Sequence, residues 1–178
     1  IAVLKMDKFI IESERIRLRE FNSGDGEFIY KLLNTPGWLK YIGSRSVNCP
    51  EDGVKYIEEK LAKGYKENGF GFYLMILKST GQKAGMCGLV KRDGLDDVDI
   101  GFALLPEFEN FGYASEASQS VLKFAKDILK LHRIAAITVP YNYSSIKLLE
   151  KLGMKFEKTI NIPNDTEDLL LYTKELYD

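Results

Sequence analysis

Residue types that define several common classes of protein are scarce in this sequence. Its 178 residues include two cysteines, Cys49 and Cys87, and a single histidine, His132. Two cysteines cannot build the disulfide framework of a small secreted domain, and their spacing matches no metal-binding motif. A lone histidine between a predicted helix and a predicted strand argues against a Ser-His-Asp triad. We therefore expect a protein that holds no metal ion.

The sequence also lacks an excess of charge of either sign and any long apolar run. Its 25 basic and 26 acidic residues give a net charge of -1, which offers no electrostatic reason to bind nucleic acid or an anionic membrane. The longest apolar runs have the length of a strand, so none can span a bilayer. The first six residues are too short for a signal peptide. We expect a cytoplasmic protein without a nucleic-acid or membrane partner.

Two familiar phosphate-binding loops are missing as well. No segment matches Gly-x-x-x-x-Gly-Lys-Ser/Thr, and no Gly-x-Gly-x-x-Gly follows a predicted strand. These absences exclude a P-loop nucleotide site and a dinucleotide-binding fingerprint. A phosphate site in this chain must therefore use a different kind of loop.

What the sequence does contain is enough apolar material for one well-packed core. Hydrophobic residues make up 45% of the chain and aromatic residues 12%. A chain of 178 residues is too short for two comfortable domains. We predict a single domain over residues 1–178, in which residues 1–9 form a tail.

The most informative segment lies in the second half of the chain. Residues 99–106 are typical of a buried strand, and the Glu-Asn-Phe-Gly-Tyr-Ala sequence at 109–114 leads from it into an amphipathic helix. The first amides of a helix have no partner within it, and the helix dipole favours an anion there. The sequence therefore predicts a phosphate site on the amides of Gly112, Tyr113, Ala114 and Ser115.

The segments after this helix alternate between strand and helix signals. Ile134–Val139 is a β-branched run of strand length. A short helix follows, with Asn142 as its N-cap and Gly153 as its C-terminal stop. Residues 154–160 and 169–176 are typical of two further strands joined by a turn-rich segment.

The first half gives a similar mixture of elements. We expect a strand up to Phe21, helices over about residues 24–33 and 50–63 with a loop at 36–41 between them, and strands over residues 70–78, 84–91 and 98–105. The whole pattern predicts an α/β (α+β) fold. Its central mixed, mostly antiparallel, twisted sheet of about seven strands has helices on both faces.

The order and spacing of these segments resemble the GNAT superfamily of N-acetyltransferases. The segments that carry the resemblance are the strand and long helix around Gly112-x-Ala114, then Asn142-x-x-Ser145, and Leu148–Met154. Within the superfamily, the chain is similar to the branch of the ribosomal-protein alanine N-acetyltransferases. Residues 11–20 look like the opening strand of that branch and residues 85–89 like its third strand. The likeness extends over nearly the whole chain from about residue 10 onward.

The predicted phosphate turn departs from the family pattern. The family usually has Gln or Arg at the start of this turn and one more glycine, whereas this chain has Glu109 and Asn110. Because Asn tolerates a left-handed backbone, we expect the turn to form. The Glu109 carboxylate repels a pyrophosphate unless it points to solvent. We expect cofactor binding to survive, with a weaker affinity if that carboxylate faces the phosphate.

The resemblance implies acetyl-CoA as a co-substrate and no metal. Its pyrophosphate is expected on the amides of residues 112–115, and Asn142 is expected to bind the pantetheine arm. The arm would run along the strand edge at Leu104 and Leu105. Pro106 has no amide hydrogen, so strand pairing should end near it and leave backbone groups for an amide-containing ligand.

The resemblance also implies two residues for proton transfer. Asp99 stands where many family members have a glutamate general base, and its shorter side chain favours a water relay. Ser145 matches a serine that protonates the leaving thiolate in this branch. Each has an ordinary alternative, as a hydrogen-bonded strand residue or as a residue of the first helical turn. Tyr141, Tyr143 and Tyr172 are alternative proton donors.

Three other residues have weaker claims to a role. Trp38 and Tyr41 lie in a predicted loop, where they either wall an acceptor pocket or simply pack. Cys87 lies in a predicted strand near the site. A buried structural thiol is favoured there over an acyl-cysteine intermediate, because no histidine or lysine partner is evident.

The sequence thus predicts an acetyl-CoA-dependent N-acetyltransferase that acts on a primary amine. The branch resemblance favours a protein N-terminal amine, and a small amine such as a polyamine or an aminoglycoside stays open. The competing class is a non-catalytic acyl-CoA-binding or protein-interaction module, suggested by Glu109 and by an aspartate at the usual glutamate position. Both a monomer and a homodimer are compatible with the sequence.

Overall fold

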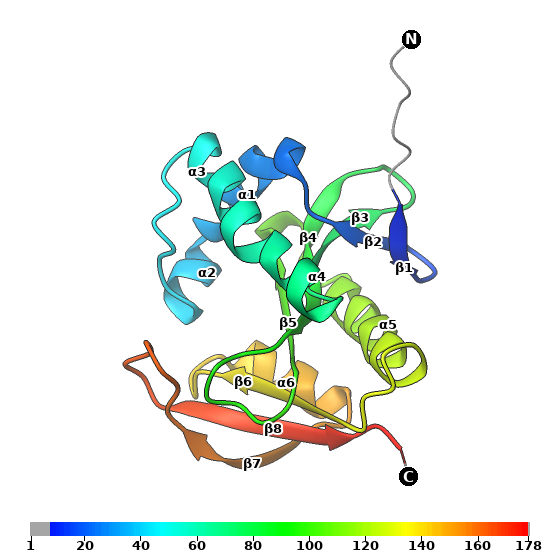
Figure 1. Ribbon diagram of the computed structural model, residues 1–178, viewed down its shortest axis with the longest axis vertical. Coiled ribbons are helices and arrows are strands. Elements are labelled where there is room, and N and C mark those ends of the chain that lie inside the picture. Colours follow the sequence, from blue (N-terminus) through cyan, green and yellow to red (C-terminus); the bar gives the residue numbers. More distant parts are fainter. Residues whose placement is uncertain (1–7, 178) are drawn as a thin grey trace.

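The computed structural model describes residues 8–177 around one eight-stranded sheet (Figure 1). In spatial order its strands are β1 (Phe9–Glu12), β2 (Ile16–Glu20), β3 (Phe72–Leu77), β4 (Lys83–Val90), β5 (Asp99–Leu104), β6 (Arg133–Thr138), β8 (Leu169–Glu175) and β7 (Lys155–Ile160). Neighbouring strands are antiparallel, except for the parallel pair β5 and β6. The predicted mixed sheet is confirmed. It has one strand more than expected, because the first predicted strand is the hairpin of β1 and β2.

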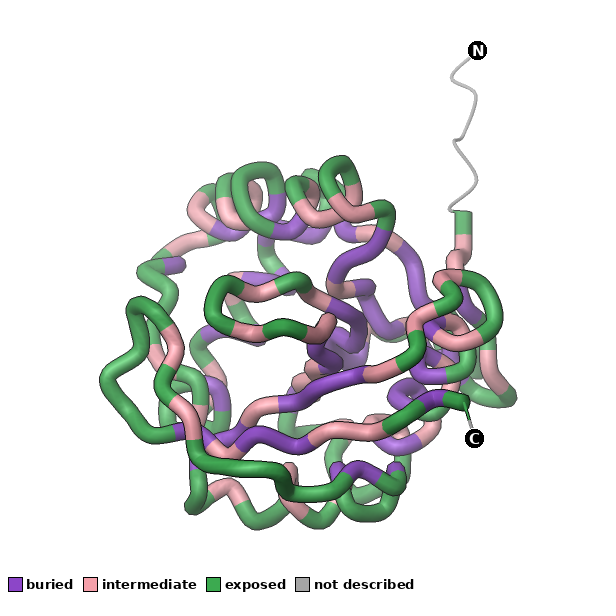
Figure 2. The backbone as a smooth tube through the Cα atoms, turned by 60° about the horizontal axis from the view of Figure 1, so that its bottom comes forward, coloured by how far each residue is buried: buried purple, intermediate pink, exposed green. Residues whose placement is uncertain are grey.

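Helices cover both faces of this sheet. They are η1 (Ser23–Asp25), α1 (Gly26–Leu33), α2 (Pro36–Tyr41), α3 (Pro50–Tyr56), η2 (Ile57–Leu61), α4 (Ala62–Asn68), η3 (Pro106–Phe108), α5 (Tyr113–Asp127) and α6 (Tyr143–Lys151). Successive side chains of a strand point to opposite faces, so Leu74 packs in the core under α1 and α2, whereas Met75 packs in the core under α5. Figure 2 shows the buried residues concentrated along the central strands.

Helices α1 and α3, on the face of the sheet to which Leu74 points, pack unusually closely. A Cβ atom added to Gly53 of α3 would lie 2.1 Å from the carbonyl oxygen of Gly26 in α1. Only glycine permits such an approach of two backbones. The helix predicted to end near residue 63 continues through a π-helical turn, η2, to the left-handed Gly69. These closely packed helices cover β3 and β4 on this face.

The loop expected at residues 36–41 is wrong, because these residues form helix α2. The side chain of Thr35 accepts a hydrogen bond from the Trp38 amide at 3.3 Å, and Pro36 occupies the first helical position. Both features are strong helix-start signals. Trp38 anchors the helix, since only 8% of it is exposed.

Residues 1–7 of the predicted tail lie outside the described residues, and β1 already begins at Phe9. Within residues 8–177, no helix combines the length and the apolar character needed to cross a membrane.

Candidate active site

The central feature of the site is the divergence of β5 from β6. The two strands share one register pair, Asp99 with Ala135, and beyond it no β-pair joins them in the part of the chain that is described. In Figure 1, β5 runs between the group β1 to β4 and the separate group β6, β8 and β7. A parallel sheet that opens in this way leaves backbone groups of both strands without sheet partners.

Strand alternation identifies which groups of β5 face the gap. The amide of Leu105 donates to Ala84 in β4 at 2.9 Å, and the carbonyl of Val98 accepts from Ala135 in β6 at 2.9 Å. Backbone groups two residues apart point the same way, so those of Phe102 and Leu104 face the gap. Of the two predicted residues, Leu104 thus faces the gap, whereas the amide of Leu105 is occupied by β4. The sequence did not single out Phe102.

The turn between β5 and α5 has the backbone that the sequence predicted. Asn110 has φ +67° and Gly112 has φ +82°, both left-handed, and α5 begins at Tyr113. No side chain caps the helix at Gly112. The first amides of α5 therefore remain available to a ligand. The Glu109 side chain is exposed to solvent.

An arginine that the sequence did not indicate braces this turn. Arg15, between β1 and β2, donates from Nε to Glu116 Oε1 at 2.7 Å and from Nη1 to the Phe111 carbonyl at 2.9 Å. Its guanidinium also lies over the Tyr113 ring, 4.5 Å from the centroid. Local patterns could not find this contact, because Arg15 and Glu116 are 101 positions apart.

Asp99 lies at the closed end of the gap and is almost fully buried. Its Oδ2 accepts a hydrogen bond from Nε of Arg92 at 2.9 Å. Burial raises the pKa of Asp99 to about 6, although the charge and the hydrogen bond of Arg92 oppose that rise. A carboxyl group with this pKa is ionised at neutral pH and can still accept a proton, which is what general-base catalysis requires.

Ser145 lies in the first turn of α6, directly after β6. Its amide donates to Oδ1 of Asn142 at 3.3 Å, which confirms Asn142 as the N-cap. The hydroxyl of Ser145 is half-buried, and no hydrogen bond engages it among the described residues. Asn142 therefore uses its side-chain Oδ1 and its backbone carbonyl to accept hydrogen bonds from the first turn of α6. The Ser145 hydroxyl has no such bond within residues 8–177 and can interact with a ligand.

The alternative tyrosine donors are placed in three different environments. Tyr143 is 71% exposed. Tyr172 is 5% exposed, packs its ring on Phe156, and has a pKa raised by burial. Tyr141 donates its hydroxyl to Glu167 at 2.8 Å.

The two residues predicted to line an acceptor pocket, Trp38 and Tyr41, lie in different environments. Trp38 is buried in the helical core, and its Nε1 donates to the Gly43 carbonyl at 3.1 Å. Tyr41 is half-buried, with its ring 5.9 Å from that of Tyr141. This contact joins α2 to the β6–α6 connection, and Glu167 extends it to the β7–β8 loop.

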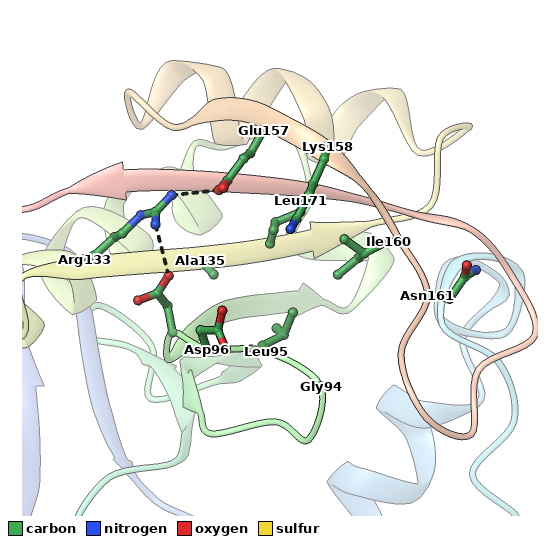
Figure 3. Close-up of a pocket in the computed structure, with 11 residues that line it drawn as sticks. Gly94, Leu95, Asp96, Arg133, Ala135, Glu157, Lys158, Ile160, Asn161 and Leu171 are labelled. Atoms are coloured by element: carbon green, nitrogen blue, oxygen red, sulfur yellow. Dashed lines mark hydrogen bonds and ion pairs between the residues drawn. The ribbon is translucent and has the colours of Figure 1, made fainter.

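A small hollow of about 140 Å³ lies beside the closed end of the gap (Figure 3). Arg133 of β6 crosses it and meets three carboxylates: Asp97 at 3.7 Å, Glu157 at 2.7 Å and Glu175 at 3.3 Å. These ion pairs tie the β4–β5 loop to β6, β7 and β8. The ion pairs of Arg133 therefore brace the strands around the hollow.

Two residues that draw attention in the sequence lie outside this chemistry. Cys87 is fully buried beside Ser118, and burial raises its pKa to about 12, so the thiol is unreactive. His132 packs on the Tyr177 ring. Within residues 8–177, no group of three histidine, cysteine or acidic residues could hold a metal ion.

Comparison with known proteins gives a consistent picture. Residues 15–155 match the family described as acetyltransferase (GNAT) domain. The chain is 30% identical to the uncharacterized N-acetyltransferase YnaD of Bacillus subtilis (strain 168), over 91% of this chain and 94% of YnaD.

Solved structures agree with this match. A GNAT-family acetyltransferase from Bacillus anthracis is 30% identical, with a TM-score of 0.76 over 95% of this chain and 99% of its own. The ribosomal L7/L12 α-N-protein acetyltransferase RimL, solved in complex with coenzyme A, has a TM-score of 0.79 over 94% of this chain and 98% of its own. At 16% identity, RimL shares the fold alone.

Proposed function

The chain belongs to the GNAT acetyltransferase family and is an acetyl-CoA-dependent N-acyltransferase, and we propose that its acceptor is the N-terminal α-amine of a protein. The observation that carries this proposal is the environment of Asp99. This carboxylate is buried at the closed end of the gap between β5 and β6 and has one cationic partner. Its pKa of about 6 suits one class of amine better than another.

The groups that would hold acetyl-CoA follow from the backbone of the gap. The amides of Gly112, Tyr113, Ala114 and Ser115 would bind its pyrophosphate at the start of α5. Backbone groups of Phe102 and Leu104, which face the gap, would pair with the amides of its pantetheine arm. At the other wall, Asn142, the N-cap of helix α6, would contact that arm.

Acetyl-CoA supplies an acetyl thioester, and the residues of the chain move the two protons of the transfer. The acceptor ammonium gives one proton to Asp99 through a water, and the resulting neutral nitrogen bonds to the acetyl carbon. The bond between that carbon and the sulfur breaks, and Ser145 gives a proton to the thiolate. The nitrogen, positively charged once it has bonded to the acetyl carbon, gives up its second proton through water to restore the Ser145 hydroxyl, and Asp99 releases its proton to solvent.

The pKa values favour one acceptor class over the other. A protein α-amine has a pKa of about 7.7 to 8.0 and a lysine amine one of about 10.4. The carboxyl group of Asp99, with a pKa of about 6, is a weaker base than either amine. Its pKa lies roughly 2 units below that of the α-amine and more than 4 units below that of the lysine amine. These differences correspond to ~3 and ~6 kcal/mol. Asp99 is therefore matched to the α-amine.

A direct assay is thiol release from acetyl-CoA with a panel of acceptors. The panel should contain a peptide with a free N-terminus and no lysine, the same peptide with a blocked N-terminus and one lysine, a polyamine and an aminoglycoside. We expect the free N-terminal peptide to react at least ~10-fold faster than the blocked one at pH 7.5.

The other outcomes distinguish the remaining readings. Faster release with the polyamine or the aminoglycoside would assign a small-molecule acceptor and overturn the proposal. Tight acetyl-CoA binding without release for any amine would indicate a binding module. Mass spectrometry of the peptide locates the acetyl group and so confirms which amine has reacted.

A further inference from the structure

Two aspartates, Asp25 and Asp99, are almost fully buried among residues 8–177, and they are held in very different ways. Asp25 receives four hydrogen bonds, from Nη1 and Nη2 of Arg19, Nζ of Lys83 and the amide of Asn22. Asp99 receives one side-chain bond, from Nε of Arg92 at 2.9 Å. No hydrogen bond reaches its second oxygen, Oδ1, among residues 8–177. Both carboxylate oxygens of Asp25 thus accept two hydrogen bonds each, whereas one oxygen of Asp99 accepts none in the described part of the chain.

Arg92 reaches this carboxylate from outside the sheet. Val90, the last residue of β4, pairs with Asp99 across the strands, and Arg92 follows two residues later in the β4–β5 connection. The Arg92 side chain is 35% exposed, whereas that of Asp99 is 2% exposed. The cation therefore stays hydrated on one side while it neutralises a carboxylate that is almost fully buried, which limits the cost of the ion pair.

The other charged groups near this pair face Arg92 or neighbouring residues. On α3, burial raises the pKa of Tyr56, while the positively charged Arg45 and Arg92 lower it. Behind β6, Arg133 is engaged by Asp97. Arg92 is thus the charged side chain that acts on Asp99 itself.

We infer that Arg92 is a positioning residue, which fixes the Asp99 carboxylate and holds it ionised with Oδ1 open to the proton of the acceptor. This inference rests on the proposed role of Asp99 as the general base. Burial alone would push the pKa of Asp99 above its value of about 6. Without the cation, the pKa of Asp99 would rise further, and a larger fraction of the carboxyl group would be protonated and unable to accept a proton. If a second cationic side chain also donated to Oδ1, as happens at Asp25, neither oxygen of Asp99 would be left to accept a proton.

The test is the pH dependence of kcat, measured from pH 5 to 9 at saturating acetyl-CoA and peptide. For Arg92→Met, we expect the acidic limb to move upward by about one pH unit or more, with most of the rate recovered at pH 9. Arg92→Lys keeps the charge and should return the limb toward the wild-type position. Because the acceptor is the same throughout, its own titration cancels from the comparison.

A matched control is Lys91→Met, which removes a positive charge from the adjacent, exposed residue. This variant should keep the wild-type pH profile. If Arg92→Met instead lowers kcat by the same factor at every pH, Arg92 is merely structural and the inference is overturned. Arg92→Gln gives the same test if the methionine variant does not fold.

The failure of the underlying proposal has a different signature. If Asp99→Asn retains the wild-type rate and pH profile, Asp99 is not the base, whatever Arg92 does. If Asp99→Asn is impaired while Arg92→Met keeps the wild-type acidic limb, the base assignment stands and the role of Arg92 is overturned. Thermal unfolding of each variant confirms that the measured enzyme is folded.

Discussion

Nε of Arg15 lies 2.7 Å from Oε1 of Glu116, so the connection between β1 and β2 is bonded to the first turn of α5. The same guanidinium donates to the Phe111 carbonyl within the phosphate turn. The turn therefore depends on a distant part of the chain as well as on its own residues. Because its backbone is held before a ligand arrives, less conformational entropy is lost on binding.

Gly112→Val should abolish most acetyl-CoA binding. The φ of +82° is costly for any residue with a Cβ, by about 1–2 kcal/mol, and a Cβ here would also lie 3.4 Å from Nη2 of Arg15. We expect the Kd measured by calorimetry to rise ~10-fold or more. Gly69→Val is the control, since Gly69 has φ +76° with no neighbour within 4 Å and lies outside the site. Equal losses in both variants would contradict a binding role for the turn.

Ser145→Ala should lower kcat by about 10² with little change in acetyl-CoA affinity, if its hydroxyl protonates the leaving thiolate. Steady-state kinetics and calorimetry measure the two quantities separately. The neighbouring Ser144→Ala, which alters an exposed hydroxyl, should leave both unchanged. Wild-type turnover of the Ser145 variant would transfer the role to a tyrosine such as Tyr172.

Asp99→Asn should slow acetylation of an N-terminal peptide mainly below the pKa of its amine, about 7.7 to 8.0. At higher pH a larger fraction of the amine is neutral without help, so the rate should recover. A pH–rate profile of the variant against wild type checks this. A deficit that stays constant from acid to alkaline pH would make Asp99 a structural residue.

The same substitution should stabilise the folded protein at pH 7. The folded pKa of Asp99, about 6, is raised from an ordinary 3.8, so folded-state stability is lost as the pH rises through that interval. A rise of about two units corresponds to at most ~3 kcal/mol. We expect urea unfolding to show Asp99→Asn as ~1–3 kcal/mol more stable at pH 7, with the gain vanishing below pH 4. A less stable variant at pH 7 would mark the ion pair with Arg92 as net stabilising.

Asp25→Asn should have the opposite effect. Burial by itself raises the pKa of Asp25, but hydrogen bonds from Arg19, Lys83 and Asn22 outweigh it and hold the pKa below its usual value. Its contribution is therefore present above about pH 4 and lost as the pH falls through the folded pKa. Leaving the buried Arg19 guanidinium beside a neutral amide should cost ~3–5 kcal/mol at pH 7 in urea unfolding.

The control for Asp25→Asn is Glu107→Gln, which breaks a solvent-exposed ion pair with Lys31. Such pairs contribute ~0–1 kcal/mol, so this variant should unfold close to wild type. The difference between Asp25→Asn and wild type should also shrink below pH 4, as the wild-type carboxylate becomes protonated. A constant difference at all pH values would mean that packing, and not charge, is lost.

Features that depend on nearby residues could be predicted from the sequence. Gly112 and Asn110 favour left-handed backbones, and both adopt them. The side chain of Asn142 caps the helix that follows it, as expected. The sheet, its mixed pairing and the helix after the turn followed from hydrophobic periodicity. The helix at Pro36–Tyr41 was missed although its start signals were present, because a short proline- and glycine-containing segment resembles a loop.

Features that depend on residues far apart in the chain were decided only by the tertiary structure. The divergence of β5 from β6 sets which amides of the strand are free, and no local pattern of either strand encodes it. The contacts of Arg15 with Glu116 and of Tyr41 with Tyr141 each join segments about a hundred residues apart. The sequence by itself determined which residues could carry the chemistry. The packing of distant segments decided that Asp99 is buried with one cation and one open oxygen, because burial and charge pairing are properties of the assembled fold.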